Sequence, residues 1–257
     1  MKILRSLADG HRRRQEALGR ALRAEYLTAW SRYRAATPGP EAERAWSATV
    51  TRLVHKYGLA SAELAADYYE EARQAAAVSR PFTVPVADPP HPTQINAARK
   101  ALRASAALRP DDDGAELERW RVTQRDREVA AVQRLAAQAG RRTIEKAARA
   151  DPEAVGWVRV TGGNACAFCA LLAMRGLVFA DSTRARRTAA GDPYHDRCAC
   201  TAEPVFRGRP SDPEPEIAEW EALYYDASHG VYGAEKVRAF RRAYDAKYGG
   251  RNSPVTA

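Results

Sequence analysis

Apolar residues in the first 150 positions recur at steps of three and four, which is the spacing of one face of a helix. One stripe runs over residues 18–33 and a second over residues 46–57. The intervening Thr-Pro-Gly-Pro at 37–40 cannot continue a helix, because proline lacks the backbone N–H and clashes with the preceding turn. The pattern therefore predicts two helices separated by a tight break.

Local signals predict how the helices continue. Gly58 lies where a left-handed cap would end the second helix, and Ser61 can cap a third helix. Prolines crowd residues 79–93, which predicts an extended connector and the main internal boundary. Further helices are predicted at 93–108 and 115–149, the latter being the longest in the chain.

The sequence pattern changes from helical spacing to short runs of strand-forming residues after residue 152. Residues 155–160, 176–179 and 203–206 are rich in strand-forming types and predict three short strands, enough for a small sheet. Residues 181–192 read as an exposed, arginine-rich loop. Helical spacing returns after Pro215.

The predicted fold class is mainly α. An extended helical N-terminal region is followed by a small α+β module with a few short strands, and then by C-terminal helices. The predicted organisation is a helical region at 1–80, a proline-rich linker at 81–92, a helical region at 93–150, a small Cys/His module at 151–210, and C-terminal helices with a tail at 211–257.

The composition favours a helical protein without a membrane-spanning segment. The 53 alanines favour slender helices, because alanine is the best helix former and fills little core volume. No run approaches the 18 apolar residues that suggest a membrane span. The apolar start of the chain is soon broken by Asp9 and by the run at 11–14, so we expect no secretory signal.

The net charge of +9 favours polyanionic partners, nucleic acid above all. The arginines of the loop at 184–187 are candidates for contacts with phosphates. The dense arginines of 115–149 are interspersed with acidic residues, so we interpret them as a solvated helix face with salt-bridge partners. That interpretation covers Arg119, Arg121, Arg125, Arg127, Arg134, Arg141 and Arg142.

The strongest chemical signal is the cysteine pattern C-x-x-C followed by H-x-x-C-x-C. It comprises Cys166, Cys169, His195, Cys198 and Cys200. Zinc takes four thiolate or imidazole ligands in a tetrahedron at about 2.0–2.3 Å, so five candidates are available for four places. The pattern predicts a structural zinc site that staples a small domain, with the choice among the five ligands left open.

Two other chemistries use the same residues. Two disulfides would suit four cysteines in an oxidising compartment, and a cysteine nucleophile could use His195 as its base. We find no export signal that would favour disulfides, and a nucleophile does not explain why the cysteines occur as two close pairs. The common enzyme motifs are absent from the sequence, so we expect no enzyme. Residues 162–164 predict a tight turn before Cys166, which Arg159 and Thr161 could orient through backbone carbonyls.

These motifs resemble the MuF-like minor capsid (head morphogenesis) family of tailed phages, especially the variants in phages of actinobacteria. The resemblance covers about residues 140–207 and is carried by the stretches 155–161, 166–169, 194–201 and 204–206. Members of that family commonly have proline after the histidine, where this chain has Asp196, a position that provides no ligand.

The resemblance implies a low-copy virion protein that associates with the portal and other head proteins in the head interior, after assembly in the host cytoplasm. Such proteins act in head morphogenesis, DNA packaging or DNA delivery and have no established catalytic activity in this form. The family's metal-binding positions fall on the five cysteine and histidine residues named above. The alternative is a basic, zinc-stapled nucleic-acid-binding protein that acts on packaged or ejected DNA.

Overall fold

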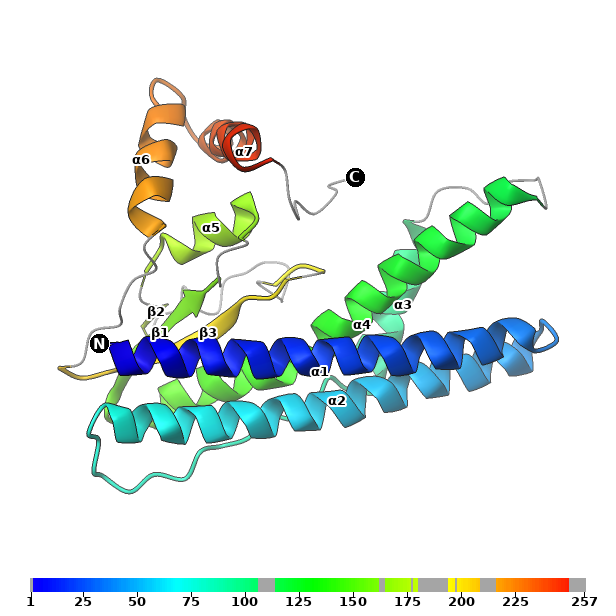
Figure 1. Ribbon diagram of the computed structural model, residues 1–257, viewed down its shortest axis with the longest axis horizontal. Coiled ribbons are helices and arrows are strands. Elements are labelled where there is room, and N and C mark those ends of the chain that lie inside the picture. Colours follow the sequence, from blue (N-terminus) through cyan, green and yellow to red (C-terminus); the bar gives the residue numbers. More distant parts are fainter. Residues whose placement is uncertain are drawn as a thin grey trace.

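Long helices separated by proline and glycine breaks dominate the computed structural model (Figure 1). It describes residues 2–105, 114–161, 165–176, 178–179, 194–196, 198–208 and 216–249. Its helices are α1 (Lys2–Ala35), α2 (Pro40–Ala75), α3 (Pro92–Ala104), α4 (Ala115–Ala150), α5 (Ala167–Ala173), α6 (Ile217–Ala227) and α7 (Ala234–Tyr248). Its strands are β1 (Ala154–Val160), β2 (Val178–Phe179) and β3 (Thr201–Phe206). The predicted mainly α fold with a small sheet is confirmed.

The break at 37–40 turns the chain back on itself, so that α1 and α2 lie side by side and antiparallel (Figure 1). Pro40 occupies the start of α2, where its missing N–H has no helical partner to lose. Tyr26 of α1 packs against Trp46 and Val50 of α2, and all three are buried. The two predicted stripes thus face each other across one core.

The predicted helix end at Gly58 is wrong, because α2 continues unbroken from residue 40 to residue 75. A Cβ on Gly58 would lie 3.0 Å from the Cβ of Pro89, so glycine here permits close packing of the proline-rich segment. Ser61 caps no helix; its hydroxyl donates to the side chain of Gln15 on α1 at 2.7 Å. Both residues serve contacts between elements rather than helix boundaries.

The proline-rich segment, residues 81–91, has neither helix nor strand and contacts α4. The backbone N–H of Ala87 donates to Thr143 Oγ1 of α4 at 3.0 Å. After this segment α3 begins, and it ends at Ala104, earlier than predicted. Ile95 of α3 and Val132 of α4 are buried in the same core as Val50, so residues on both sides of the prolines pack together.

The three strands form an antiparallel sheet in the order β2-β1-β3. Trp157 of β1 pairs with Pro204 of β3, and the register shifts at Gly156. The ring of Phe206 on β3 lies 5.6 Å from the ring of Tyr69 on α2, measured between centroids. The sheet therefore shares a core with the ends of α2 and α4.

A buried ion pair ties the end of α4 to α2. Arg73 donates to the carboxylate of Asp151, whose side chain is 1% exposed. Tyr69 also donates to that carboxylate, at 3.2 Å, and the N–H of Glu153 donates to its other oxygen at 3.0 Å. These contacts fix the turn that leads from α4 into β1.

The remaining helices form a separate aromatic cluster on the far side of the sheet from α1 (Figure 1). Trp220 of α6 and Phe240 of α7 pack with Tyr244, whose hydroxyl donates to the carbonyl of Ala165 at 2.9 Å. That bond connects α7 to the residue before Cys166. In the part of the chain that the structure describes, no helix has an apolar stretch long enough to traverse a lipid bilayer.

Candidate metal centre

The first two cysteines stand at the beginning of α5, a helix that the sequence analysis did not predict. Cys166 is the N-cap residue, and its sulfur accepts a hydrogen bond from the backbone N–H of Cys169 at 3.4 Å. Both cysteines are 2% exposed. The first turn of α5 therefore presents both sulfurs on one side, as a C-x-x-C knuckle requires.

The second half of the cluster lies on the segment that leads into β3. The Nε2 atom of His195 is 3.0 Å from the sulfur of Cys166 and 3.2 Å from that of Cys169. Its Nδ1 atom lies 2.6 Å from the backbone carbonyl oxygen of Asp196, which can only accept a hydrogen bond. Nδ1 is therefore the donor, and Nε2 is left with the lone pair that binds a metal.

The ligand atoms form two overlapping groups of three, within each of which all atoms lie within 4.8 Å of one another. One group is Cys166, Cys169 and His195, and the other is Cys169, Cys198 and Cys200. Cys169 belongs to both, and its sulfur is 3.6 Å from that of Cys198. The fold thus brings all five predicted residues together in an arrangement that could hold a metal ion.

The thiols share protons. A hydrogen bond with Cys169, assisted by His195 and opposed by burial, lowers the pKa of Cys166 to about 4. Hydrogen bonds with Cys169 and Cys200 hold the pKa of Cys198 far below its usual range. The pKa of Cys169 is raised, because this thiol forms hydrogen bonds with Cys166, Cys198 and Cys200. Burial opposes protonation of His195, but its hydrogen bond with Cys166 raises its pKa overall. A cation could replace the shared protons.

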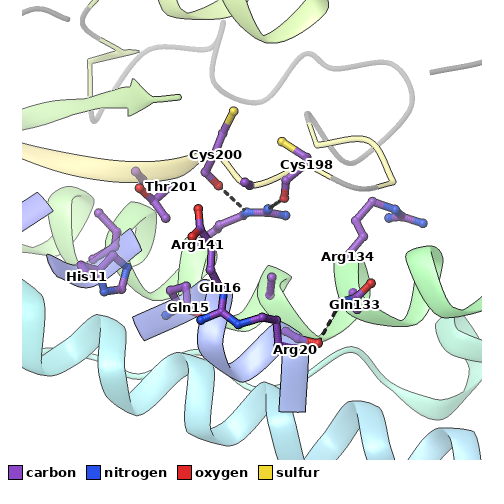
Figure 2. A pocket seen from close by; sticks show the side chains of 15 residues that line it. His11, Gln15, Glu16, Arg20, Gln133, Arg134, Arg141, Cys198, Cys200 and Thr201 are labelled. Atoms are coloured by element: carbon purple, nitrogen blue, oxygen red, sulfur yellow. Dashed lines mark hydrogen bonds between the residues drawn. The ribbon is translucent and has the colours of Figure 1, made fainter. Parts of the chain in front are cut away.

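An arginine on α4 holds the second cysteine pair in place. Arg141 donates from Nε to the carbonyl of Cys200 at 3.0 Å and from Nη2 to that of Cys198 at 2.7 Å (Figure 2). Two turns earlier on α4, Arg134 forms an ion pair with Asp196 at 2.7 Å. The interpretation of this face as solvated is therefore wrong for Arg141, which is only 6% exposed.

Tyr194, directly before the histidine, lies between two guanidinium groups. The Cζ atoms of Arg141 and Arg159 are 3.9 and 4.0 Å from the centre of its ring. Burial opposes the charge on Arg159, yet Tyr194 and the cysteines, Cys200 foremost, raise its pKa. The two cations therefore offset negative charge on the sulfurs.

Two sequence-based expectations in this region lie outside the described residues: the turn at 162–164 and the arginines at 184–187. The role of Arg141 was missed. The available signal was its spacing, because the residues four before and three after it are Ala137 and Ile144. An arginine within an apolar helix face must be buried with partners or snorkel to solvent.

A pocket of about 320 Å³ lies beneath the second cysteine pair, between α1, α4 and the start of β3 (Figure 2). Figure 2 shows the sulfurs of Cys198 and Cys200 pointing away from it, so it is distinct from the metal centre. His11 contributes one wall and stacks on Tyr68 with 4.5 Å between ring centroids. The pocket is also lined by residues 198–200, and the carbonyls of Cys198 and Cys200 accept hydrogen bonds from Arg141.

Comparison with families of known proteins identifies the family of this chain. Searches of curated proteins and of solved structures found no significant match to this chain. A family described as VG15 protein matches residues 2–227, which include the long helices, the sheet and all five residues of the Cys/His cluster. This chain therefore belongs to the VG15 protein family, a viral and phage gene family.

Proposed function

We propose that the Cys/His cluster binds one structural zinc ion through four of its five donors. Tetrahedral zinc with Zn–S bonds of about 2.3 Å separates its sulfurs by about 3.8 Å. The 3.6 Å between the sulfurs of Cys169 and Cys198 is close to that separation. Thiolate and imidazole donors are also the set that zinc takes in structural sites.

The proposed site is structural because it has no room for catalysis. Four protein ligands fill the coordination sphere, whereas catalytic zinc keeps a position for water or substrate. Cys166 and His195 have the spacing of a nucleophile and its base, but Cys166 is almost entirely buried. We therefore propose a non-enzymatic protein.

We further propose that the protein is a minor capsid or head morphogenesis protein of a tailed phage. It would associate with the portal and the head interior of the virion, after assembly in the host cytoplasm. The observation that carries this proposal is the gathering of the five MuF-type positions, Cys166 to Cys200, into one cluster. Membership of a phage gene family supports it.

The architecture suits a protein that makes extended contacts. Helices α2 and α4 each have 36 residues, about 54 Å at the usual helical rise. Arg141 joins the cysteine segment to α4, so the metal module is attached to the long helices. A zinc staple would hold this module in one orientation against them.

Metal content tests the zinc proposal. Protein purified under reducing conditions should carry one zinc per chain, and its thiols should react with a thiol reagent only after chelation. Cys198→Ser should lower zinc content or affinity, whereas Ser228→Ala, far along the chain, should leave both unchanged. Four freely reactive thiols and no bound metal would contradict the proposal.

Localisation tests the capsid role separately. The protein should be detected by mass spectrometry in purified virions of its phage, and should co-purify with the portal protein when the two are co-expressed. Its presence in infected-cell lysate but not in virions, together with failure to bind portal, would refute that role while leaving the zinc site unaffected.

The alternative function is nucleic-acid binding, acting on packaged or ejected DNA. The net charge of +9 supports it in general terms. A specific groove, remote from the metal centre, supports it further.

A further inference from the structure

A groove of about 490 Å³ is lined by residues of α1, α2, α3 and α4. Among the described residues, three tryptophans and a tyrosine line it, together with six arginines and two glutamates. We call it the Arg–Trp groove. Its volume falls within the range of about 300–1,000 Å³ that is usual for small-ligand sites.

Two of the tryptophan rings of the groove are partly accessible, whereas Trp46 is buried. Trp30 of α1 and Trp120 of α4 are both partly exposed. The guanidinium carbons of Arg34 and Arg125 lie 5.5 and 5.3 Å from the centre of the Trp30 ring. Rings and cations at this spacing can hold a planar base by stacking while a neighbouring arginine meets its phosphate.

The two glutamates of the groove are occupied within the protein. Glu128 accepts hydrogen bonds from Tyr26 at 3.0 Å and from Trp46 at 3.4 Å, and it pairs with Arg99. Glu43 pairs with Arg103 at 2.8 Å and accepts from a tyrosine hydroxyl. Two further carboxylates lie beside the groove, where Arg125 pairs with Asp126 at 2.9 Å and Arg34 with Glu118 at 3.5 Å. Among the described residues, six arginines of the groove therefore meet four carboxylates, and cations remain in excess.

One buried cation has unused donor capacity. Arg99 is 6% exposed, and its Nη2 atom has no hydrogen-bond partner among the residues that the structure describes. Buried polar groups nearly always have partners, so this donor could serve an acceptor that enters the groove. Arg121, at the same groove, lies 3.6 Å from the exposed carboxylate of Glu118 and shares it with Arg34.

We propose that the Arg–Trp groove binds single-stranded nucleic acid, with bases stacked on Trp30 and Trp120 and phosphates on the arginines. An acidic peptide would satisfy the charge but would make no use of stacking on the rings. A duplex would offer phosphates but keep its bases stacked on one another. The combination of rings and excess cations is the one that single strands use.

This site is independent of the zinc centre and of the proposed capsid role. None of its lining residues belongs to the Cys/His cluster or its supporting arginines. It also differs from the arginine loop at 184–187 that the sequence suggested for phosphate contacts.

The test uses the full chain and a fluorescein-labelled oligothymidylate, followed by anisotropy at several salt concentrations. We expect the single strand to bind more tightly than a duplex of equal length and to quench tryptophan fluorescence. Trp120→Ala should weaken binding by about tenfold, as expected for one lost stacked base. Arg121→Gln should reduce the slope of log affinity against log salt by about 0.7, the value for one phosphate on a single strand.

Matched controls separate the groove from general charge or aromatic content. Tyr232→Ala removes an aromatic side chain that is 83% exposed elsewhere on the molecule, and Arg142→Gln removes an exposed arginine of α4 that does not line the groove. Both should bind like the parent protein. Thermal unfolding checks that each variant folds; if Trp120→Ala does not fold, Arg121→Gln still tests the site.

Several results would overturn the proposal. These are equal affinities for Trp120→Ala and Tyr232→Ala, a duplex bound as tightly as the single strand, or no binding at low salt. Displacement of the oligonucleotide by polyglutamate at equal charge concentration would identify the groove as a site for an acidic protein segment instead.

Discussion

Replacing Arg141 by methionine tests how the long helices support the metal centre. Methionine keeps most of the length of the side chain but removes every donor and the charge. The carbonyls of Cys198 and Cys200 would lose the hydrogen bonds they now receive at 2.7 and 3.0 Å. The ring of Tyr194 would lose one of its two stacked guanidinium groups.

The expected loss in free energy of unfolding follows from these two hydrogen bonds. A hydrogen bond that involves a charged group contributes about 1.5–3 kcal/mol. Two such bonds, taken at the lower end because the segment can relax, give about 3 kcal/mol. For a protein of this size that corresponds to a fall of roughly 6–12 °C in the unfolding midpoint. Loss of a residue that orients metal ligands typically costs about 10–100-fold in metal affinity, a similar free energy.

The assay is a zinc competition titration with a chromophoric chelator, combined with thermal unfolding of the zinc-loaded protein. Arg142→Met is the matched control, because Arg142 is the next residue of α4 and is exposed. It should change stability by no more than about 0.5 kcal/mol. Arg141→Lys should recover only part of the loss, since one ammonium cannot reproduce the planar fork that reaches both carbonyls.

One outcome would refute a role of Arg141 in positioning the candidate ligands. If Arg141→Met and Arg142→Met had the same zinc affinity and the same unfolding midpoint, the hydrogen bonds from α4 would not position the ligands. A loss of stability with unchanged zinc affinity would show that Arg141 serves the fold alone.

Three further predictions concern the helical core. Asp151→Asn leaves Arg73 buried without its counter-charge and should cost about 3–5 kcal/mol in urea denaturation; a loss under 1 kcal/mol would contradict the buried pair. Gly140→Ala would place a Cβ 2.5 Å from Ser61 Oγ on α2 and should destabilise by about 1–3 kcal/mol in the same assay; an unchanged midpoint would rule out this close approach. Burial, assisted by the charge of Arg14, lowers the pKa of His11 to about 4. The unfolded chain therefore takes up that proton first, so stability should fall by about 3 kcal/mol as the pH drops from about 6.5 to 4. His11→Phe should flatten this part of the pH profile, and an unaltered profile would exclude His11 as its source.

Local signals predicted the regular elements well where the cause was local. Proline and glycine at 37–40 and the prolines at 79–93 interrupt helices in any context, and the structure has no helix at residues 36–39 or 76–91. Strand-forming residues at 155–160 and 203–206 lie within β1 and β3. The predicted end at Gly58 failed because Pro89, distant in sequence, is the reason for that glycine.

At the candidate metal centre too, features with local causes were predicted and features that depend on distant segments were missed. All five potential ligands could be identified from residue type and spacing, because few residues bind metal and their intervals match those of known sites. Helix α5, only seven residues long, was missed because it is too short to show helical periodicity. The support from Arg141 was missed because nothing near it in sequence shows that two carbonyls require it.

The proline breaks between helices and the set of candidate metal ligands are properties of the chain itself, since propensity, proline breaks and ligand chemistry act over a few residues. Which arginines are solvated and which are buried was decided only by the packed fold. Arg141 and Arg142 are adjacent and chemically identical, yet one is buried against the cysteine segment and the other is exposed. The difference arises because burying a charge is favourable only where acceptors from distant segments meet it, and folding alone brings those acceptors into place.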